Sequence, residues 1–504
     1  MEHFLDLFMK SHQRPGPVSQ SSSPAQQESS PAQQEPSSAE QVPEGAPSTK
    51  ATTRSPFPEH EQHIRSIDDS LFIELVRSTW DKSRSRTCKV IDRNAGSYNY
   101  CVTLDLNEEE EFVVRVPFRG TRETWTEDHA FELRTEILNM KYLYKKTKIP
   151  LPFIHQWDDG FDNILGAPYI IMDRIYGVSA HENLWYDEEM WAKTADGTSI
   201  LPGADSPSPE LERKRLRFLQ DLAKIMADLQ NHVFDKMGAP QCADHWDPPP
   251  PTVGHYFEHS HESWVKRGPF SSTAEYLQLK KDEIAAEALP EYDSNNPSEL
   301  TDARAFSRIA PIMYDALPRS VDKYVTDADY ETTPETFVLA HPDLDLQNIF
   351  VDEDGEITGI IDWAGLRTVP RWAGWASFPL FLRKDFDHEY TVLQTSFEYP
   401  HAPWKLDFYR KAYHGYLQET LDPEGTGSYN DGKYTLKSGA TCAALEALDR
   451  WVLRDANIHR LLKEIPVLKG LFIKDFRERL GSEEGWPAAE AMLKEEFKAL
   501  FRHT

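Results

Sequence analysis

Apolar residues recur in two patterns along the first part of the chain. Two runs are rich in branched and aromatic residues, as strands are, a third repeats at helical spacing, and a fourth is short and almost wholly apolar. The predicted order is strand, strand, helix, strand, at residues 88–106, 108–118, 127–147 and 167–177. An acidic tip at Asn107–Glu110 joins the first two runs, which predicts an antiparallel hairpin.

Helical spacing dominates the later part of the chain. Apolar residues at steps of three and four predict an amphipathic helix over residues 210–234, and similar spacing returns at 273–289 and 440–465. A polar segment before these helices, at 185–209, is expected to be a surface insertion. Mixed β-structure followed by helices predicts an α+β fold with a β-rich lobe and a helical lobe, at residues 64–176 and 177–504.

The segment that precedes the β-rich lobe has a third texture. Residues 1–63 are rich in Ser, Pro, Gln and Glu, and the sequence SSPAQQE occurs twice in succession there. So few branched and aromatic side chains cannot bury enough surface to offset the entropy of the chain. We therefore expect a disordered tail at 1–63 and a first helix over Ile64–Thr79, where apolar residues resume helical spacing.

Composition narrows the range of functions. The formal net charge of −28 over 504 residues argues against broad binding to nucleic acid or to an anionic membrane. No run of eighteen apolar residues suggests a membrane span, and the four scattered cysteines are typical of a reduced compartment. Because the first residues resemble neither a signal nor a transit peptide, we expect a cytoplasmic protein. The oligomeric state stays open.

Four polar side chains gather in the stretch VLAHPDLDLQNIFVDEDGEITGIIDWAG, which begins at Val338. His341, Asp343 and Asn348 follow one strand-like run, and Asp362 ends a hairpin whose turn contains Gly355. The hairpin should bring Asp362 back beside Asn348. An Asp that orients or deprotonates a hydroxyl, with an amide and a second carboxylate holding Mg²⁺, is the set that phosphoryl transfer requires.

A phosphotransferase must also hold nucleotide phosphates, and the β-rich lobe offers candidates for this. Gly96 and Ser97 stand at a predicted turn between strands, where backbone N–H groups can cover phosphates. Arg115 lies inside an apolar strand, and a charge there needs a partner or a ligand. The helix that follows supplies Glu136 as the ion-pair partner.

Together these motifs resemble the aminoglycoside phosphotransferase-like family, which shares the protein-kinase-like fold. The chain looks most similar to the large fungal branch of this family, on the segments HPDLDLQNIF, ITGIIDW, VVRVP and RGPFSSTAEYL. The resemblance covers roughly Arg65–Leu462. The resemblance implies an ATP- and Mg²⁺-dependent transfer of the γ-phosphoryl group to a hydroxyl of a small molecule. Asp343 would be the catalytic base, Asn348 and Asp362 the Mg²⁺ ligands, and Arg115 the phosphate contact.

The resemblance implies further roles. Glu136 would clamp Arg115, and His341, grouped with the catalytic candidates, would bond the loop backbone. In the segment YIIMDRIYG, the backbone of Asp173 and Ile175 would bind the adenine edge, and Gly177 would let the chain turn into the second lobe.

Several alternatives remain open. Kinase-like enzymes usually have Lys where this chain has Arg115, and the phosphate loop has only one clear glycine, so a nucleotide-binding scaffold without useful turnover is the second hypothesis. A protein kinase is disfavoured because no DFG…APE segment follows. Asp345 is expected to be a loop hydrogen-bonder. Three tryptophans are expected to pack the core, and three histidines to lie in a surface loop instead of a metal site: Trp363, Trp372, Trp375, His255, His259 and His261.

Overall fold

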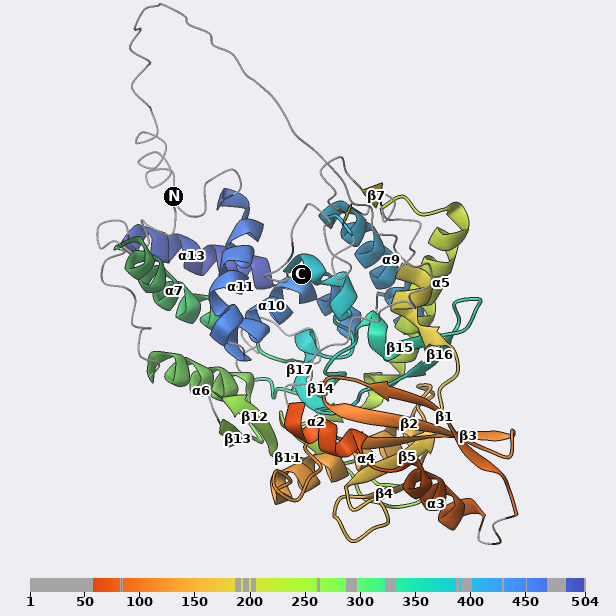
Figure 1. Cartoon of the computed structure of the whole chain (residues 1–504). Coiled ribbons are helices and arrows are strands. Elements are labelled where there is room, and N and C mark those ends of the chain that lie inside the picture. The colour runs from red at the N-terminus through yellow and green to blue at the C-terminus, as the bar shows by residue number, and fades with distance from the viewer. Residues whose placement is uncertain are drawn as a thin grey trace, which may run out of the picture.

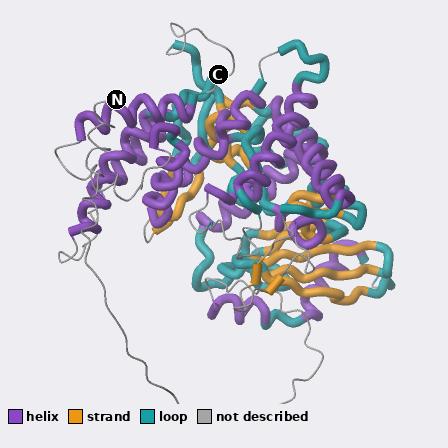
Figure 2. Tube along the Cα trace, turned by 90° about the horizontal axis from the view of Figure 1, so that it is seen from above, coloured by secondary structure: helices purple, strands orange, loops and turns teal. Residues whose placement is uncertain are grey.

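The computed structural model describes residues 58–502 with gaps. These gaps are 82, 84, 186–191, 194–198, 201–204, 261–262, 287–296, 322–331, 387–389, 391–400, 428–429, 450 and 469–485. Strands gather in one part of the molecule and helices make up most of the rest (Figure 2). The expected α+β architecture with a β-rich and a helical lobe is thus confirmed. Of the tail expected at 1–63, residues 1–57 lie outside the described residues.

The small lobe is built on one antiparallel sheet of five strands in the order β1-β2-β3-β5-β4 (Figure 1). Its strands are β1 (Cys88–Ala95), β2 (Asn99–Leu106), β3 (Glu110–Pro117), β4 (Ile154–Asp158) and β5 (Tyr169–Asp173). The β2–β3 hairpin is confirmed, and its turn places Asn107 and Glu108 at positive φ. β4 was not predicted, because Pro150 and Pro152 obscured the start of a strand that only pairing with β5 reveals.

Three helices accompany this sheet. They are α2 (Pro58–Arg65), α3 (Asp69–Trp80) and α4 (Glu127–Lys146). The prediction of one continuous first helix from Ile64 is wrong, since the side chain of Asp68 accepts a hydrogen bond from the amide of Ser70 and caps α3. α2 begins at Pro58, inside the segment expected to be a tail. The long helix predicted at 127–147 is confirmed as α4, which Thr126 caps.

α4 belongs to the large lobe as much as to the small one. Its apolar residues Leu133, Ile137, Met140 and Leu143 join the main hydrophobic core, whereas α3 packs a separate cluster on the other face of the sheet. Three lysines tie its outer surface to the segment 244–247 of the large lobe. Lys141 and Lys146 pair with Asp244 and Asp247, and Lys145 donates to the carbonyl of His245.

The large lobe contains most of the helices. They are α5 (Pro209–Ala227), α6 (Thr273–Ala286), α7 (Pro297–Asp315), α9 (Pro403–Leu421), α10 (Ser438–Asp449), α11 (Trp451–Glu464) and α13 (Trp486–Phe501). Among its described residues, no helix is long and apolar enough to cross a membrane. Trp363, Trp372 and Trp375 are buried in its core, as predicted.

Short sheets connect these helices. β6 (Val178–Ser179), β15 (Ile349–Val351) and β16 (Ile357–Ile360) form one, and β9 (Val233–Phe234), β14 (Phe337–Ala340) and β17 (Arg367–Pro370) form another. Three pairs complete the set: β10 (Ala239–Gln241) with β11 (Thr252–Gly254), β12 (Tyr256–Ser260) with β13 (Ser263–Arg267), and β7 (Ala192–Lys193) with β8 (Ser199–Ile200).

Two predictions for this lobe need correction. The helix predicted to reach residue 234 ends at Ala227, and Val233 lies in β9, because pairing with Val338 of β14 overrides local helical spacing. The segment with His255 and His259, expected to be a surface loop, contains β12, which pairs with β13, and His261 lies outside the described residues. No group of three or more His, Cys, Asp or Glu able to hold a metal occurs among the described residues.

Gly177 lies between β5 of the small lobe and β6 of the large lobe. Its φ is +107°, and a Cβ there would lie 2.2 Å from the carbonyl oxygen of Val351. Only glycine fits this conformation and this spacing.

Candidate active site

The four polar residues of the stretch 341–362, which we call the catalytic window, lie on two loops joined by a hairpin. His341, Asp343 and Asn348 follow β14, and Asp362 follows β16. β15 pairs with β16 in the predicted hairpin, with Gly355 at φ +83° in its turn. The amide of Ile361 donates to the carbonyl of Asn348 at 2.9 Å, so Asp362 returns beside Asn348.

Asn348 fixes the carboxylate of Asp343. Its Nδ2 donates both to the Asp343 carbonyl at 2.9 Å and to Asp343 Oδ2 at 2.8 Å. With Nδ2 occupied in this way, Asn348 Oδ1 has no hydrogen-bond partner among the described residues. The arrangement holds one carboxylate in place and presents one neutral oxygen, the kind of ligand that a hard cation accepts.

Asp362 is strained and crowded by other acids. Its φ is +63°, a left-handed conformation that residues other than glycine rarely adopt. Burial and the nearby carboxylates of Glu136 and Asp343 raise the pKa of its carboxyl to about 6, while Arg115 opposes the shift. Part of the residue is nevertheless exposed to solvent. No hydrogen bond or ion pair reaches its side chain from the described residues. A bound cation at Asp362 and Asn348 Oδ1 would relieve this crowding.

His341 holds the window together from the inside. Its Nε2 donates to the carbonyl of Ile361 at 3.0 Å, and its Nδ1 accepts from the amide of Asp343 at 3.1 Å. The ring packs edge-on against Trp363 with centroids 4.5 Å apart. Burial lowers the pKa of His341 to about 4, so the ring is neutral at pH 7. With both nitrogens committed to backbone groups, His341 positions the loop and does not move protons.

Asp345 behaves as a loop hydrogen-bonder, as expected. It caps the short helix η4 (Leu346–Asn348) by accepting from the amide of Leu346 at 2.9 Å. Its other oxygen pairs with Lys384 Nζ at 2.7 Å. Asp345 therefore stabilises the short helix that contains Asn348, and its carboxylate is used by that cap and by Lys384.

Arg115 and Glu136 form the predicted ion pair, at 2.6 Å between Arg115 Nη2 and Glu136 Oε1. Side chains alternate along β3, so Val114 and Val116 face the small core while Arg115 faces α4. Arg115 Nε is buried and has no hydrogen-bond partner among the described residues. An orphaned guanidinium N–H suits an anionic ligand such as a phosphate.

Backbone amides at the turn and at the hinge, expected to be available to a nucleotide, are used in hydrogen bonds within the protein. The amide of Gly96 closes the β1–β2 turn by donating to Asn99 O at 3.0 Å, so Gly96 has no N–H left for a phosphate, and Ser97 stands at the tip. At the hinge, the amide of Asp173 donates to Phe153 O at 3.0 Å. Contacts of the Asp173 and Ile175 backbone with the adenine edge stay a prediction.

A cavity of about 350 Å³ lies beside the Arg115–Glu136 pair, and sequence reasoning missed it. Its walls come from β2, β3, α4, the β12–β13 hairpin and the segment after Asp362, and include Arg119, His129, Glu132, Trp264 and Arg367. The sequence placed β3 beside β2 and α4, through the predicted hairpin and the Arg115–Glu136 pair, but no pattern placed the β12–β13 hairpin or the segment after Asp362 beside them. The available signal was Glu132, one helical turn before Glu136 on the same face of α4.

The chain matches the sequence model of the phosphotransferase enzyme family, APH, over residues 87–390. This match covers more than half of the chain, and the protein therefore belongs to that family. The kinase-like fold that the sequence implied is confirmed with it.

Curated relatives point to fungi. Proteins called "Altered inheritance of mitochondria protein 9, mitochondrial" from Yarrowia lipolytica and Zygosaccharomyces rouxii are 24% and 21% identical, over 36% and 64% of this chain. The alignments cover 32% and 55% of those relatives, so the chain spans about a third to about half of their length. These organisms agree with the expected fungal branch.

Solved structures of similar shape include two phosphotransferases. Aminoglycoside phosphotransferase APH(4)-Ia, in ternary complex with AMP-PNP and hygromycin B, is 14% identical, with 82% of this chain and 99% of that chain covered and a TM-score of 0.38. Macrolide 2'-phosphotransferase type I is 13% identical, with 85% and 97% covered and a TM-score of 0.37. TM-scores this low support no argument about function.

Proposed function

We propose that this protein transfers the γ-phosphoryl group of ATP to a hydroxyl of a small molecule. The observation that carries the proposal is the convergence of Asp343, Asn348 and Asp362 next to the Arg115–Glu136 pair. Asp362 and Asn348 Oδ1 would hold Mg²⁺, which when bound offsets the charge of the phosphates. Membership in the phosphotransferase enzyme family supports the reaction class, and the net charge of −28 favours a small acceptor over nucleic acid.

The transfer balances with the residues at hand. The acceptor oxygen forms a bond to the γ-phosphorus, and the bond from that phosphorus to the β–γ bridging oxygen breaks, so ADP leaves. The proton of the hydroxyl passes to the carboxylate of Asp343, which Asn348 holds at a fixed angle. Arg115 meets the phosphate oxygens through Nε while Glu136 keeps its guanidinium in place.

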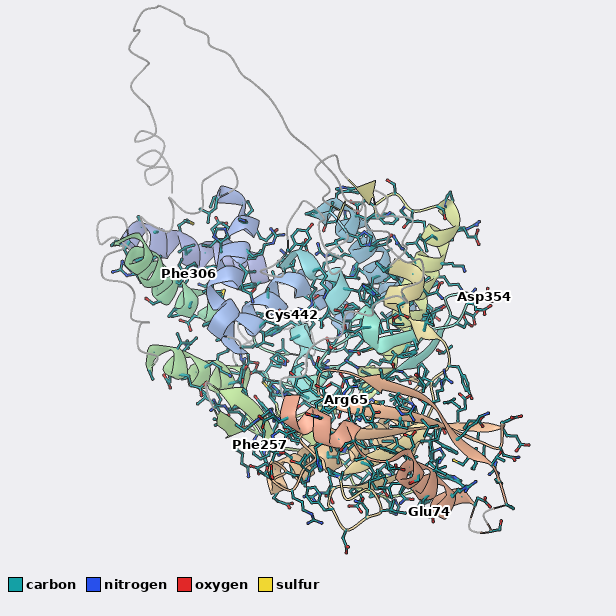
Figure 3. The ribbon with its side chains drawn as sticks, in the orientation of Figure 1. Arg65, Glu74, Phe257, Phe306, Asp354 and Cys442 are labelled. Carbon is teal, nitrogen blue, oxygen red and sulfur yellow. The ribbon has the colours of Figure 1, made fainter. Side chains whose placement is uncertain are left out.

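The test compares ADP release from Mg·ATP across a panel of alcohols for the natural chain and for Asp343→Asn. We expect kcat to fall by about 10²–10⁴-fold with Mg·ATP binding retained, because the variant cannot accept the proton. Asp354→Asn is the matched control, since Asp354 stands at the exposed tip of the β15–β16 hairpin, on the far edge of the view in Figure 3 from Phe257. Undiminished turnover by Asp343→Asn would refute the assignment of the base.

A nucleotide-binding scaffold without turnover is the second candidate. Two observations favour it: Arg115 stands where kinase-like enzymes have Lys, and the Gly96 amide is used inside its turn. Binding of Mg·ATP without ADP release from any alcohol in the panel supports the scaffold and contradicts the kinase.

The proposal also includes the cellular compartment of the protein. All four cysteines are unpaired, which supports a reducing compartment, and we assign the protein to the cytoplasm. The names of the curated relatives point instead to mitochondria. Imaging of the full chain fused to a fluorescent protein decides between the two, and overlap with a mitochondrial marker would overturn the cytoplasmic assignment.

A further inference from the structure

The cavity beside Arg115 lies at the phosphate end of the candidate site. Arg115 and Glu136 form part of its wall, whereas the hinge residues Asp173 and Ile175 do not line it. In phosphoryl transfer the acceptor approaches the phosphorus from the side opposite the leaving ADP. A nucleotide whose base lies at the hinge would therefore point its γ-phosphate toward this cavity.

The cavity also reaches the catalytic window. The wall formed by Ala364–Arg367 follows Asp362 directly along the chain. Within that wall, a Cβ built on Gly365 would lie 4.0 Å from the side chain of Pro342, the residue before Asp343. A molecule in the cavity thus borders both the proposed metal ligand and the segment that carries the proposed base.

Cations outnumber acids around the cavity once the Arg115–Glu136 pair is set aside. Arg119 and Arg367 line it together with one acid, Glu132. Neither Arg367 nor Glu132 has an ion-pair partner among the described residues, and Arg367 lies instead over the ring of Tyr256 at 4.0 Å. Burial raises the pKa of Glu132 to about 7, which weakens its negative charge at neutral pH. In a chain of net charge −28 this is a locally positive site.

Aromatic side chains form another part of the lining. Phe131 on α4 and Phe257 on β12 both face the cavity, as do Trp125 and Trp264. Arg119 covers the ring of Trp264 at 5.1 Å. Phe257 lies where the β12–β13 hairpin meets the small lobe (Figure 3). Such walls favour a ligand with a planar or apolar body.

We propose that this cavity is the acceptor site and that the acceptor is an anionic alcohol, carrying a carboxylate or phosphate on a flat apolar body. Arg367 and Arg119 would bind the anion, and the aromatic walls would hold the body with its hydroxyl toward Asp343. The same two arginines would repel polyamines such as aminoglycosides. The class of acceptor rests on the proposed phosphoryl transfer, but the binding preference does not require turnover.

Three benzyl alcohols of similar size test the preference: 4-(hydroxymethyl)benzoate, 1,4-benzenedimethanol and 4-(aminomethyl)benzyl alcohol, which differ in the para substituent and hence in charge. Binding is measured by ligand-observed NMR titration of the full chain, with and without Mg·ATP. We expect the anion to bind at least fivefold more tightly than the neutral probe, and the cation most weakly. Arg367→Met should remove the advantage of the anion but leave the neutral probe unchanged.

Arg217→Met is the matched control, because Arg217 is an exposed arginine of α5 paired with Glu356. Equal binding of the three probes, tightest binding of the cation, or an unchanged preference in Arg367→Met would overturn the proposal. Competitive displacement of the anion by ATP would also overturn it, because the cavity would then be the triphosphate site. Anion preference without any ADP release keeps this inference and removes the proposed kinase activity.

Discussion

The catalytic window and the acceptor cavity treat polar groups in opposite ways. In the window, His341 and Asp343 are bonded to neighbouring side chains and backbone. In the cavity, Arg367 and Glu132 have no ion-pair partner among the described residues. A satisfied polar network stabilises the fold, whereas charges without partners cost stability and are available to a ligand. Substitutions of the hydrogen-bonded residues of the window, unlike those of Asp362, should therefore lower stability, and substitutions in the cavity should alter binding.

The largest effect is expected at Trp363, the buried aromatic residue that packs against His341 of the window. Its side chain is fully buried and Nε1 donates to the carbonyl of Ile360. Trp363→Ala should lower the free energy of unfolding by about 3–5 kcal/mol, measured by urea denaturation. The cavity offers the comparison, since Trp264 is 42% exposed and Trp264→Ala should cost less than about 1 kcal/mol. Equal losses would erase the contrast between the two regions.

Acid should expose the second difference. The pKa of His341 falls from an ordinary 6.5 to about 4 on folding, so the unfolded chain binds the extra proton between these values. Stability therefore declines as pH falls from 6.5 to 4, by at most about 3 kcal/mol from this residue. His341→Gln should flatten that decline in denaturation curves recorded across the range. His63→Gln, on the exposed surface of α2, is the control and should leave the decline intact.

The smallest effect is expected in the cavity and has the opposite sign. Burial raises the pKa of Glu132 from 4.5 to about 7, so the folded chain keeps a proton that the unfolded chain loses, and stability falls as pH rises through this range. Glu132→Gln should stabilise the protein at pH 8 by about 1 kcal/mol, a value reduced for solvent screening, and not at pH 4. Glu127→Gln, 82% exposed, is the control. A loss of stability at pH 8 would show that Glu132 supports the fold.

Local sequence was sufficient for the window because its parts are close along the chain. A turn glycine and two apolar runs determine the β15–β16 hairpin, and that hairpin alone returns Asp362 to Asn348. The Arg115–Glu136 pair was accessible for a similar reason: a charge inside an apolar strand demands a partner, and α4 comes next.

The remainder depends on contacts distant in sequence. Val233 follows helical spacing but pairs with β14, more than a hundred residues later. The cavity also includes the β12–β13 hairpin and the segment after Asp362, and no periodicity shows that these two segments meet β3 and α4. The internal hydrogen bonds of the Gly96 and Asp173 amides could not be predicted either, because the sequence does not show which acceptor a backbone amide meets.

The three lysines on the outer surface of α4 have a consequence for regulation. Lys141 and Lys146 are partly exposed, and their partners Asp244 and Asp247 are more than half exposed, so salt screens each contact. The helix that presents Glu136 to Arg115 is thus anchored by ammonium groups that acylation can neutralise. Changes in ionic strength or in lysine modification would weaken the contacts between α4 and the segment 244–247 without altering a residue of the site.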